Sequence, residues 1–149
     1  MCFCRLTNVC IRLKQAAETN WRRPTNPLFV FLVENIMSEL LPIWDQSGAL
    51  QRLMNKEALL QRVLLMFLDQ AEPRLMEIRA DINQGRISQA KATTHMLKGS
   101  AGEVGAMRLH ASLGRLEACL ISEPARAADL YNTVAYNYQL FVNEAKHNA

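Results

Sequence analysis

The chain has 149 residues, of which 50% are hydrophobic, 7% aromatic and 21% charged, and its formal net charge is +3. This length suits one compact domain with a core plus some additional chain, and no internal repeat or low-complexity run appears. The excess of positive charge lies in residues 1–36, which carry five basic and two acidic residues, whereas residues 37–149 hold twelve of each. Neither aromatic interleaving nor a recognition motif accompanies the basic residues, so this charge does not predict binding to nucleic acid.

Unbranched residues dominate the composition, with Leu, Ala, Met, Gln, Arg and Glu abundant and β-branched residues scattered singly. Because unbranched side chains lose little rotamer freedom in a helix, the composition predicts an all-α protein. The methionines are expected to fill the core or its boundary and not to form a cofactor site: Met54, Met66, Met76, Met96 and Met107.

Residues 1–36 are predicted to be a basic linker or extension that precedes a helical bundle over residues 37–149. Residues 28–41 are apolar, but acidic and amide residues interrupt them, and they fall short of the roughly 18–20 apolar residues that span a membrane. We therefore expect a helix from Leu28 and no membrane insertion. Residues 1–20 do not resemble a signal peptide, because basic and polar residues break any apolar run.

The four cysteines do not form a metal-binding pattern. Cys2, Cys4 and Cys10 cluster near the start and Cys119 lies far away, without a CxxC pair or a histidine at zinc-ligand spacing. Cys119 is expected to be a small core residue. We expect no metal site and no disulfide framework, which favours a reducing, cytoplasmic location.

A short helix is predicted before the bundle proper. Ser47 is suited to cap it, because a hydroxyl can accept a hydrogen bond from the free backbone N–H groups of the first turn, and the helix is expected to end at Met54. Asn55 or a nearby residue is expected to cap the longer helix that follows.

The first long helix is predicted from Lys56 onward, where apolar residues recur every three or four positions: Leu60, Val63, Leu64, Phe67, Leu68 and Ala71. Pro73 falls within this pattern. Since proline lacks the backbone N–H and clashes with the preceding turn, we expect the helix to kink or restart there. Gly85 is expected to end it.

The next helix, Ile87–Val104, carries the candidate site. Its apolar stripe occupies an arc roughly 100° wide and comprises Ile87, Ala90, Thr94, Leu97, Ala101 and Val104. His95 projects roughly 130° away from the middle of that arc and so faces solvent. Its surface neighbours at i−4, i+3, i+4 and i+7 are Lys91, Lys98, Gly99 and Gly102. Gly105 is expected to close the helix.

The two glycines beside His95 need a physical reason, since each costs a helix interior about 0.5–1 kcal/mol relative to alanine. Their missing side chains leave room for another molecule to approach. The lysines imply that the approaching or bound group is negative, and a phosphoryl group fits. A solvent-facing histidine is by default an ordinary surface residue, but these neighbours favour a surface phosphohistidine.

The following helix has an apolar seam of four leucines: Leu109, Leu113, Leu116 and Leu120. This seam places His110, Gly114 and Glu117 together on one flank, roughly 100° away. An antiparallel hairpin of the two helices brings that flank beside His95. By default His110 is a surface residue and Glu117 a solvated carboxylate.

Pro124 suits the first turn of a last helix, in which apolar residues recur at Leu130, Val134, Tyr138 and Phe141. The tail 145–149 is expected to fray. Long amphipathic helices joined by short turns bury their stripes in an antiparallel bundle. The sequence therefore predicts an all-α fold, an up-and-down four-helix bundle with additional N-terminal helical segments.

The site motif resembles the histidine phosphotransfer domain of bacterial multistep phosphorelays, and it reads His95-x-Leu97-Lys98-Gly99-Ser100-Ala101-Gly102-x-Val104-Gly105-Ala106-x-x-Leu109, followed by Leu116-Glu117. The resemblance runs from about Leu40 to Phe141. It implies a four-helix bundle whose exposed histidine takes a phosphoryl group from an aspartyl phosphate on one receiver domain and yields it to another.

The resemblance also implies a role for each matching residue. His95 is the phosphorylated residue, with Nε2 as its nucleophilic atom. Lys98 stabilises the phosphoryl group, and Lys91, which lies outside the motif, is expected from its place beside His95 to help stabilise or orient that group. Gly99 and Gly102 let the receiver dock, and Glu117, at a position often Glu or Gln in the family, orients the imidazole ring.

The chain lacks a Gly-rich nucleotide loop, a Walker lysine and paired carboxylates for magnesium, so we expect a phosphotransfer protein without an ATP site and not an autonomous kinase. No cofactor is expected in this chain, and Mg²⁺ is expected in the partner. The expected partners are response-regulator receiver domains, with the chain either a free shuttle or the C-terminal module of a hybrid sensor kinase. Two alternatives stay open: the phosphoacceptor domain of a chemotaxis-type histidine kinase, and a helical docking module that does not relay phosphate.

Overall fold

The computed structural model describes residues 26–148, and the chain divides after Met37 into two units that are described separately. In the first unit, helix α2 (Pro27–Glu39) begins after Asn26, whose amide oxygen accepts a hydrogen bond from the backbone N–H of Leu28 at 3.0 Å. The helix expected from Leu28 is therefore present, and it continues past Met37. Within the described range, no helix combines the length and the apolar character needed to cross a membrane. The expected linker over residues 1–25, including its three cysteines, lies outside the described residues.

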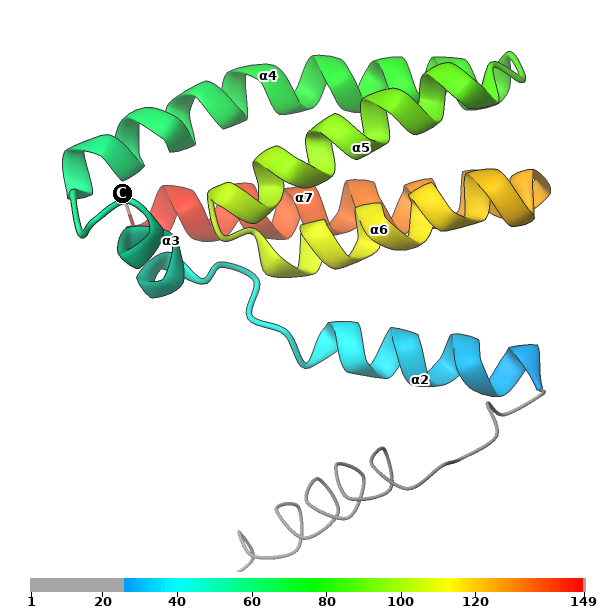
Figure 1. The fold of residues 1–149 in the computed structure, drawn as a ribbon, viewed down its shortest axis with the longest axis horizontal. Helices are drawn as coiled ribbons and strands as arrows, with labels where there is room; N and C mark the ends of the chain where they lie inside the picture. The colour runs from blue at the N-terminus through cyan, green and yellow to red at the C-terminus, as the bar shows by residue number, and fades with distance from the viewer. Residues whose placement is uncertain (1–25, 149) are drawn as a thin grey trace, which may run out of the picture. The chain divides into compact units, whose positions relative to one another are not determined.

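The second unit contains a short helix and four long ones: α3 (Gln46–Arg52), α4 (Glu57–Asn83), α5 (Ile87–Glu103), α6 (Met107–Ser122) and α7 (Ala127–Asn148). Helices α4 and α6 each pack against both α5 and α7, so the four long helices form a closed ring of neighbours. Short connections make successive helices antiparallel (Figure 1). This arrangement confirms the predicted up-and-down four-helix bundle.

The core is built from the predicted stripes. On α5 the stripe is buried from Ala90 through Val104, and on α6 all four leucines of the seam are at most 1% exposed. Aromatic rings close one part of the core, where Phe141 meets Trp44 and Phe67 edge to face, with centroids 6.1 and 5.7 Å apart. Cys119 is buried, as expected, and this burial raises the pKa of its thiol.

The turn between α5 and α6 is held by the segment that leads into α3. The Trp44 indole N–H donates to the Val104 carbonyl at 2.9 Å, and the Asp45 backbone N–H donates to the Gly105 carbonyl at 2.8 Å. Gly105 has φ +81°, and a Cβ there would collide with the Asp45 carbonyl oxygen. Only glycine adopts this positive φ without strain and also lacks the Cβ that would collide, which confirms Gly105 as the residue that closes the histidine helix. Gly85, with φ +70°, ends α4 in the same way.

The expected N-caps were wrong. Asp45, not Ser47, caps α3, and its carboxylate accepts hydrogen bonds from the Gly48 backbone N–H at 2.9 Å and from the Ser47 hydroxyl at 3.1 Å. Asn55 adopts φ +57° in the turn after α3, a conformation that asparagine tolerates better than most residues, and Lys56 precedes α4 without a side-chain cap.

Of the kink or restart expected at Pro73, the restart was wrong, because α4 runs through this residue as one helix. Pro73 is exposed, while Ala71 and Leu75 on either side are buried, so packing of the stripe offsets the lost backbone hydrogen bond. At the C-terminus, α7 continues to Asn148 and Ala145 is 1% exposed, so the tail does not fray where expected.

Two smaller expectations also need correction. Pro124 begins a short 3-10 turn, Pro124–Arg126, that leads into α7 and not the first α-helical turn itself. Four of the five methionines are more than half exposed and do not fill the core, whereas Met107 is half-buried at its boundary. The exposed four are Met54, Met66, Met76 and Met96.

Candidate functional site

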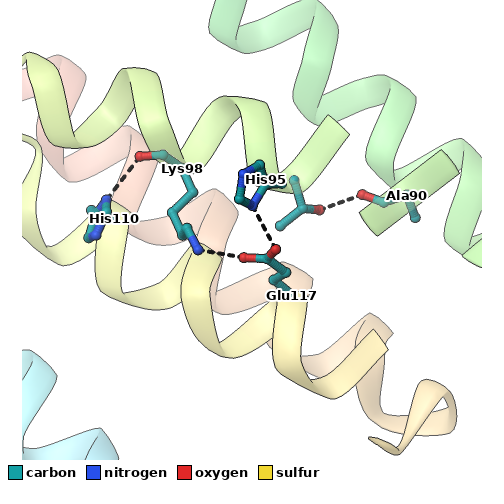
Figure 2. Close-up of polar contacts among 6 residues, drawn as sticks. Ala90, His95, Lys98, His110 and Glu117 are labelled. Carbon is teal, nitrogen blue, oxygen red and sulfur yellow. Dashed lines mark hydrogen bonds and ion pairs between the residues drawn. The ribbon is translucent and has the colours of Figure 1, made fainter. Parts of the chain in front are cut away.

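The α5–α6 hairpin brings His95 and Glu117 together, although they are far apart in the sequence (Figure 2). His95 Nδ1 lies 2.8 Å from Glu117 Oε1. Because a carboxylate oxygen can only accept, Nδ1 carries the proton and donates it to this bond. In the neutral ring the lone pair therefore resides on Nε2. The His95 side chain is 67% exposed, so the ring stands at the surface, as the sequence predicted.

The second oxygen of Glu117 binds Lys98. The Lys98 ammonium donates to Glu117 Oε2 at 2.6 Å, and the two side chains are 27% and 16% exposed. This hydrogen bond lowers the pKa of the Glu117 carboxyl from its ordinary value, burial of the carboxylate opposes the effect, and the hydrogen bond from His95 adds to the lowering. Glu117 is thus held ionised between the imidazole and the ammonium.

The candidate residues on the rest of the α5 surface fall into two groups. Gly99 is exposed, and a Cβ built on it would meet no atom within 4 Å, so it opens a bare patch of helix one turn from His95. Lys91 lies exposed one helical turn before His95 and outside the Glu117 contacts. Gly102 differs, because a Cβ there would lie 3.0 Å from the His110 ring. The structure thus gives the small size of Gly102 a reason in the packing of the hairpin, and the docking role expected for it stays a prediction.

The default expectation that His110 is an ordinary surface residue was wrong. It is half-buried, and its Nδ1–H donates to the Lys98 backbone carbonyl at 2.9 Å across the two helices (Figure 2). The sequence did place His110 on the same flank of α6 as Glu117. What it could not reveal was the space that Gly102 leaves on the facing helix.

The site offers acid–base and nucleophilic groups but no metal-binding cluster. Among residues 26–148, no group of three or more His, Cys, Asp or Glu side chains is placed to hold a metal ion. An exposed imidazole with a free Nε2 can act as a nucleophile toward an electrophile brought by another molecule. The nearby ammonium can neutralise negative charge that develops there.

Comparison with known proteins gives one match. The family model described as the Hpt domain matches residues 62–137, a range that contains every candidate site residue from Lys91 to Glu117. The searches of curated proteins and of solved structures found no match.

Proposed function

The family model matches more than half of the chain, so the chain belongs to the Hpt domain family. We propose that it relays phosphoryl groups between receiver domains through His95. Histidine phosphotransfer in phosphorelays is the activity of this family. The observation that carries the proposal for His95 is its exposed ring, with Nδ1 bound to Glu117 and Nε2 left to receive a partner.

The proposed reaction is an in-line displacement at phosphorus. Nε2 of the neutral His95 ring attacks the phosphorus of an aspartyl phosphate, the N–P bond forms, and the bond between phosphorus and the acyl oxygen breaks. The electron pair of the broken bond leaves on the aspartate carboxylate of the receiver. A second receiver aspartate then attacks the same phosphorus, and the imidazole departs with its lone pair. Each step needs geometry and charge neutralisation more than covalent help from the protein.

Glu117 is proposed to hold the reactive tautomer. Its carboxylate accepts the Nδ1 proton, so the nucleophilic lone pair stays on Nε2, and the same contact limits rotation of the ring. As the phosphoryl group arrives, it brings negative charge next to the site. Lys98, which binds the other oxygen of the same carboxylate, is proposed to share its charge between Glu117 and the incoming group, and Lys91 to add a second positive charge on the exposed side.

The partner is proposed to be a receiver domain of a response regulator or of a hybrid sensor kinase. Gly99 leaves bare helix backbone beside His95, which allows another domain to approach closely. The receiver is proposed to supply the acidic pocket and its Mg²⁺, whereas this chain supplies the nucleophile and the residues that orient it and neutralise charge.

A donor comparison tests the proposed relay. The protein is mixed with receiver domains phosphorylated by acetyl phosphate and Mg²⁺, and in parallel with candidate kinase domains and radiolabelled ATP without receivers. Acid-labile, base-stable label that depends on a phosphorylated receiver supports the relay. Label that arrives from kinase and ATP alone indicates a chemotaxis-type phosphoacceptor, and binding without label indicates a docking module.

A further inference from the structure

Two residues of α6, His110 and Glu117, bind Lys98 at its backbone and at its ammonium (Figure 2). His110 donates its Nδ1–H to the Lys98 backbone carbonyl at 2.9 Å. Gly114, about one turn later, lies beside the lysine stem, since a Cβ there would lie 3.7 Å from Lys98 Cδ, an ordinary contact distance. Glu117 accepts from the ammonium at 2.6 Å. Lys98 is therefore fixed at its backbone and bound at its ammonium by one neighbouring helix.

The backbone contact depends on Gly102. A Cβ on Gly102 would lie 3.0 Å from His110 Nδ1 and 3.3 Å from Cε1, which is too close for an unmoved ring. The ring thus occupies the space that the missing side chain leaves, and this explains a glycine in the interior of α5, where alanine would favour the helix more. Gly102 and His110 form one packing unit, separate from the exposed face at Gly99.

We propose that His110 is a positioning residue for phosphotransfer. Its ring packs against Gly102 and fixes the turn of α5 that begins at Lys98. Lys98 can then bind Glu117, and Glu117 keeps its hydrogen bond to the His95 ring. The inference rests on the proposed function, because the ring it positions is the one proposed to carry the phosphoryl group. His110 touches neither that ring nor the reacting atoms, and it acts through the backbone of Lys98.

Lys98 needs to be positioned because a lysine side chain is flexible. A lysine side chain has a long stem with many rotamers, so its ammonium is positioned only as well as its backbone and stem are held. Loss of the His110 contact lets this turn of α5 and the α6 flank shift relative to each other. A misplacement of about 1 Å can cost a catalysed step as much as 100-fold.

The test compares the full-length protein with its His110→Ala variant by three measurements. Carbon-13 NMR follows the titration of the Glu117 carboxyl, nitrogen-15 NMR reports the His95 tautomer, and phosphoramidate serves as a small donor to measure the rate of phosphorylation at His95. We expect the Glu117 pKa to rise toward its ordinary value, the Nδ1–H form to lose population and the rate to fall about tenfold, equivalent to about 1.4 kcal/mol.

Three further variants make the test specific. In His110→Asn, a side-chain N–H can still donate to the Lys98 carbonyl, and we expect it to restore most of the wild-type Glu117 titration and rate. Gly102→Ala displaces the ring and reproduces the His110→Ala defect, and the double variant is no worse than His110→Ala alone. His147→Ala is the matched control, because His147 makes the same kind of bond, to the Asn143 carbonyl at 2.6 Å, on the exposed side of α7. It leaves all three measurements unchanged.

Several outcomes overturn the inference. If His110→Ala lowers the melting temperature but leaves the Glu117 titration, the His95 tautomer and the rate as in wild type, His110 is only structural. If Gly102→Ala is harmless, or adds its full effect to His110→Ala, the packing unit does not act as described. If wild-type His95 takes no phosphoryl group, the proposed function fails instead, and the two NMR measurements still decide the role of His110.

Discussion

Replacement of Glu117 by glutamine separates the charge of this residue from its shape. The carboxylate accepts one hydrogen bond from His95 on Oε1 and one from Lys98 on Oε2. Glutamine keeps a single acceptor oxygen, and its NH₂ group can accept from neither donor. Glu117→Gln therefore loses at least one of the two bonds, and the Lys98 ammonium, 27% exposed, loses its counter-charge.

The expected size of the effect follows from these contacts. A hydrogen bond to a charged group contributes about 1.5–3 kcal/mol, and partial exposure of Lys98 and His95 places this case at the lower end. We expect the unfolding free energy at neutral pH to fall by about 1–2 kcal/mol. Nδ1–H and the Lys98 ammonium then compete for one oxygen, and weakening of the Nδ1 bond by about 1.4 kcal/mol would slow transfer to His95 roughly tenfold.

Urea unfolding and the rate of labelling by a phosphorylated receiver measure the two effects. Glu123→Gln is the matched control, because Glu123 pairs with Arg126 at 3.1 Å in an exposed i,i+3 ion pair that is worth about 0–1 kcal/mol. It should leave transfer unchanged. If Glu117→Gln unfolds and transfers as wild type does, Glu117 neither holds Lys98 nor orients His95, and the site described here is wrong.

Three further predictions concern pH and stability. Because the Glu117 pKa is lower in the folded protein than its ordinary value of 4.5, its contribution is complete at neutral pH and is lost as the pH falls through the folded pKa. The difference in unfolding free energy between wild type and Glu117→Gln should therefore shrink in acid, and a difference that stays constant across an acid titration refutes this. Leu116→Ala, at a side chain that is 0% exposed, should cost about 2–5 kcal/mol in urea unfolding, whereas Ile121→Ala, 64% exposed, should change stability little. Gly105→Ala should lower the unfolding free energy by about 1 kcal/mol or more, because Gly105 has a positive φ. Gly99→Ala should raise the unfolding free energy by about 0.5–1 kcal/mol and weaken receiver binding. Equal melting temperatures of the two variants would contradict these opposite effects.

The sequence predicted those features that depend on helical periodicity. The stripe of α5 and the leucine seam of α6 predicted the faces that are buried, and an antiparallel hairpin allowed the Glu117 flank to lie beside His95, as it does. The role of Glu117 came from the resemblance to the family. Gly85 and Gly105 were also correct, because a positive φ after a helix leaves glycine as the favoured residue.

The features that the sequence missed depend on contacts between segments. Ser47 and Asp45 are both good caps, and only the path of the backbone into α3 selects Asp45. Pro73 is tolerated because the flanking residues of α4 pack into the bundle. His110 looked like a surface residue because its partner, the space over Gly102, lies on another helix. Local propensity contains none of this information.

The most direct test of the central claim is transfer of labelled phosphoryl groups from a phosphorylated receiver to wild type and to His95→Gln. The side chain at this position is 67% exposed, so the substitution should leave the bundle folded, as circular dichroism would verify. We predict acid-labile label at His95 in wild type and none in the folded variant. Label that persists in His95→Gln at the wild-type rate would contradict the account.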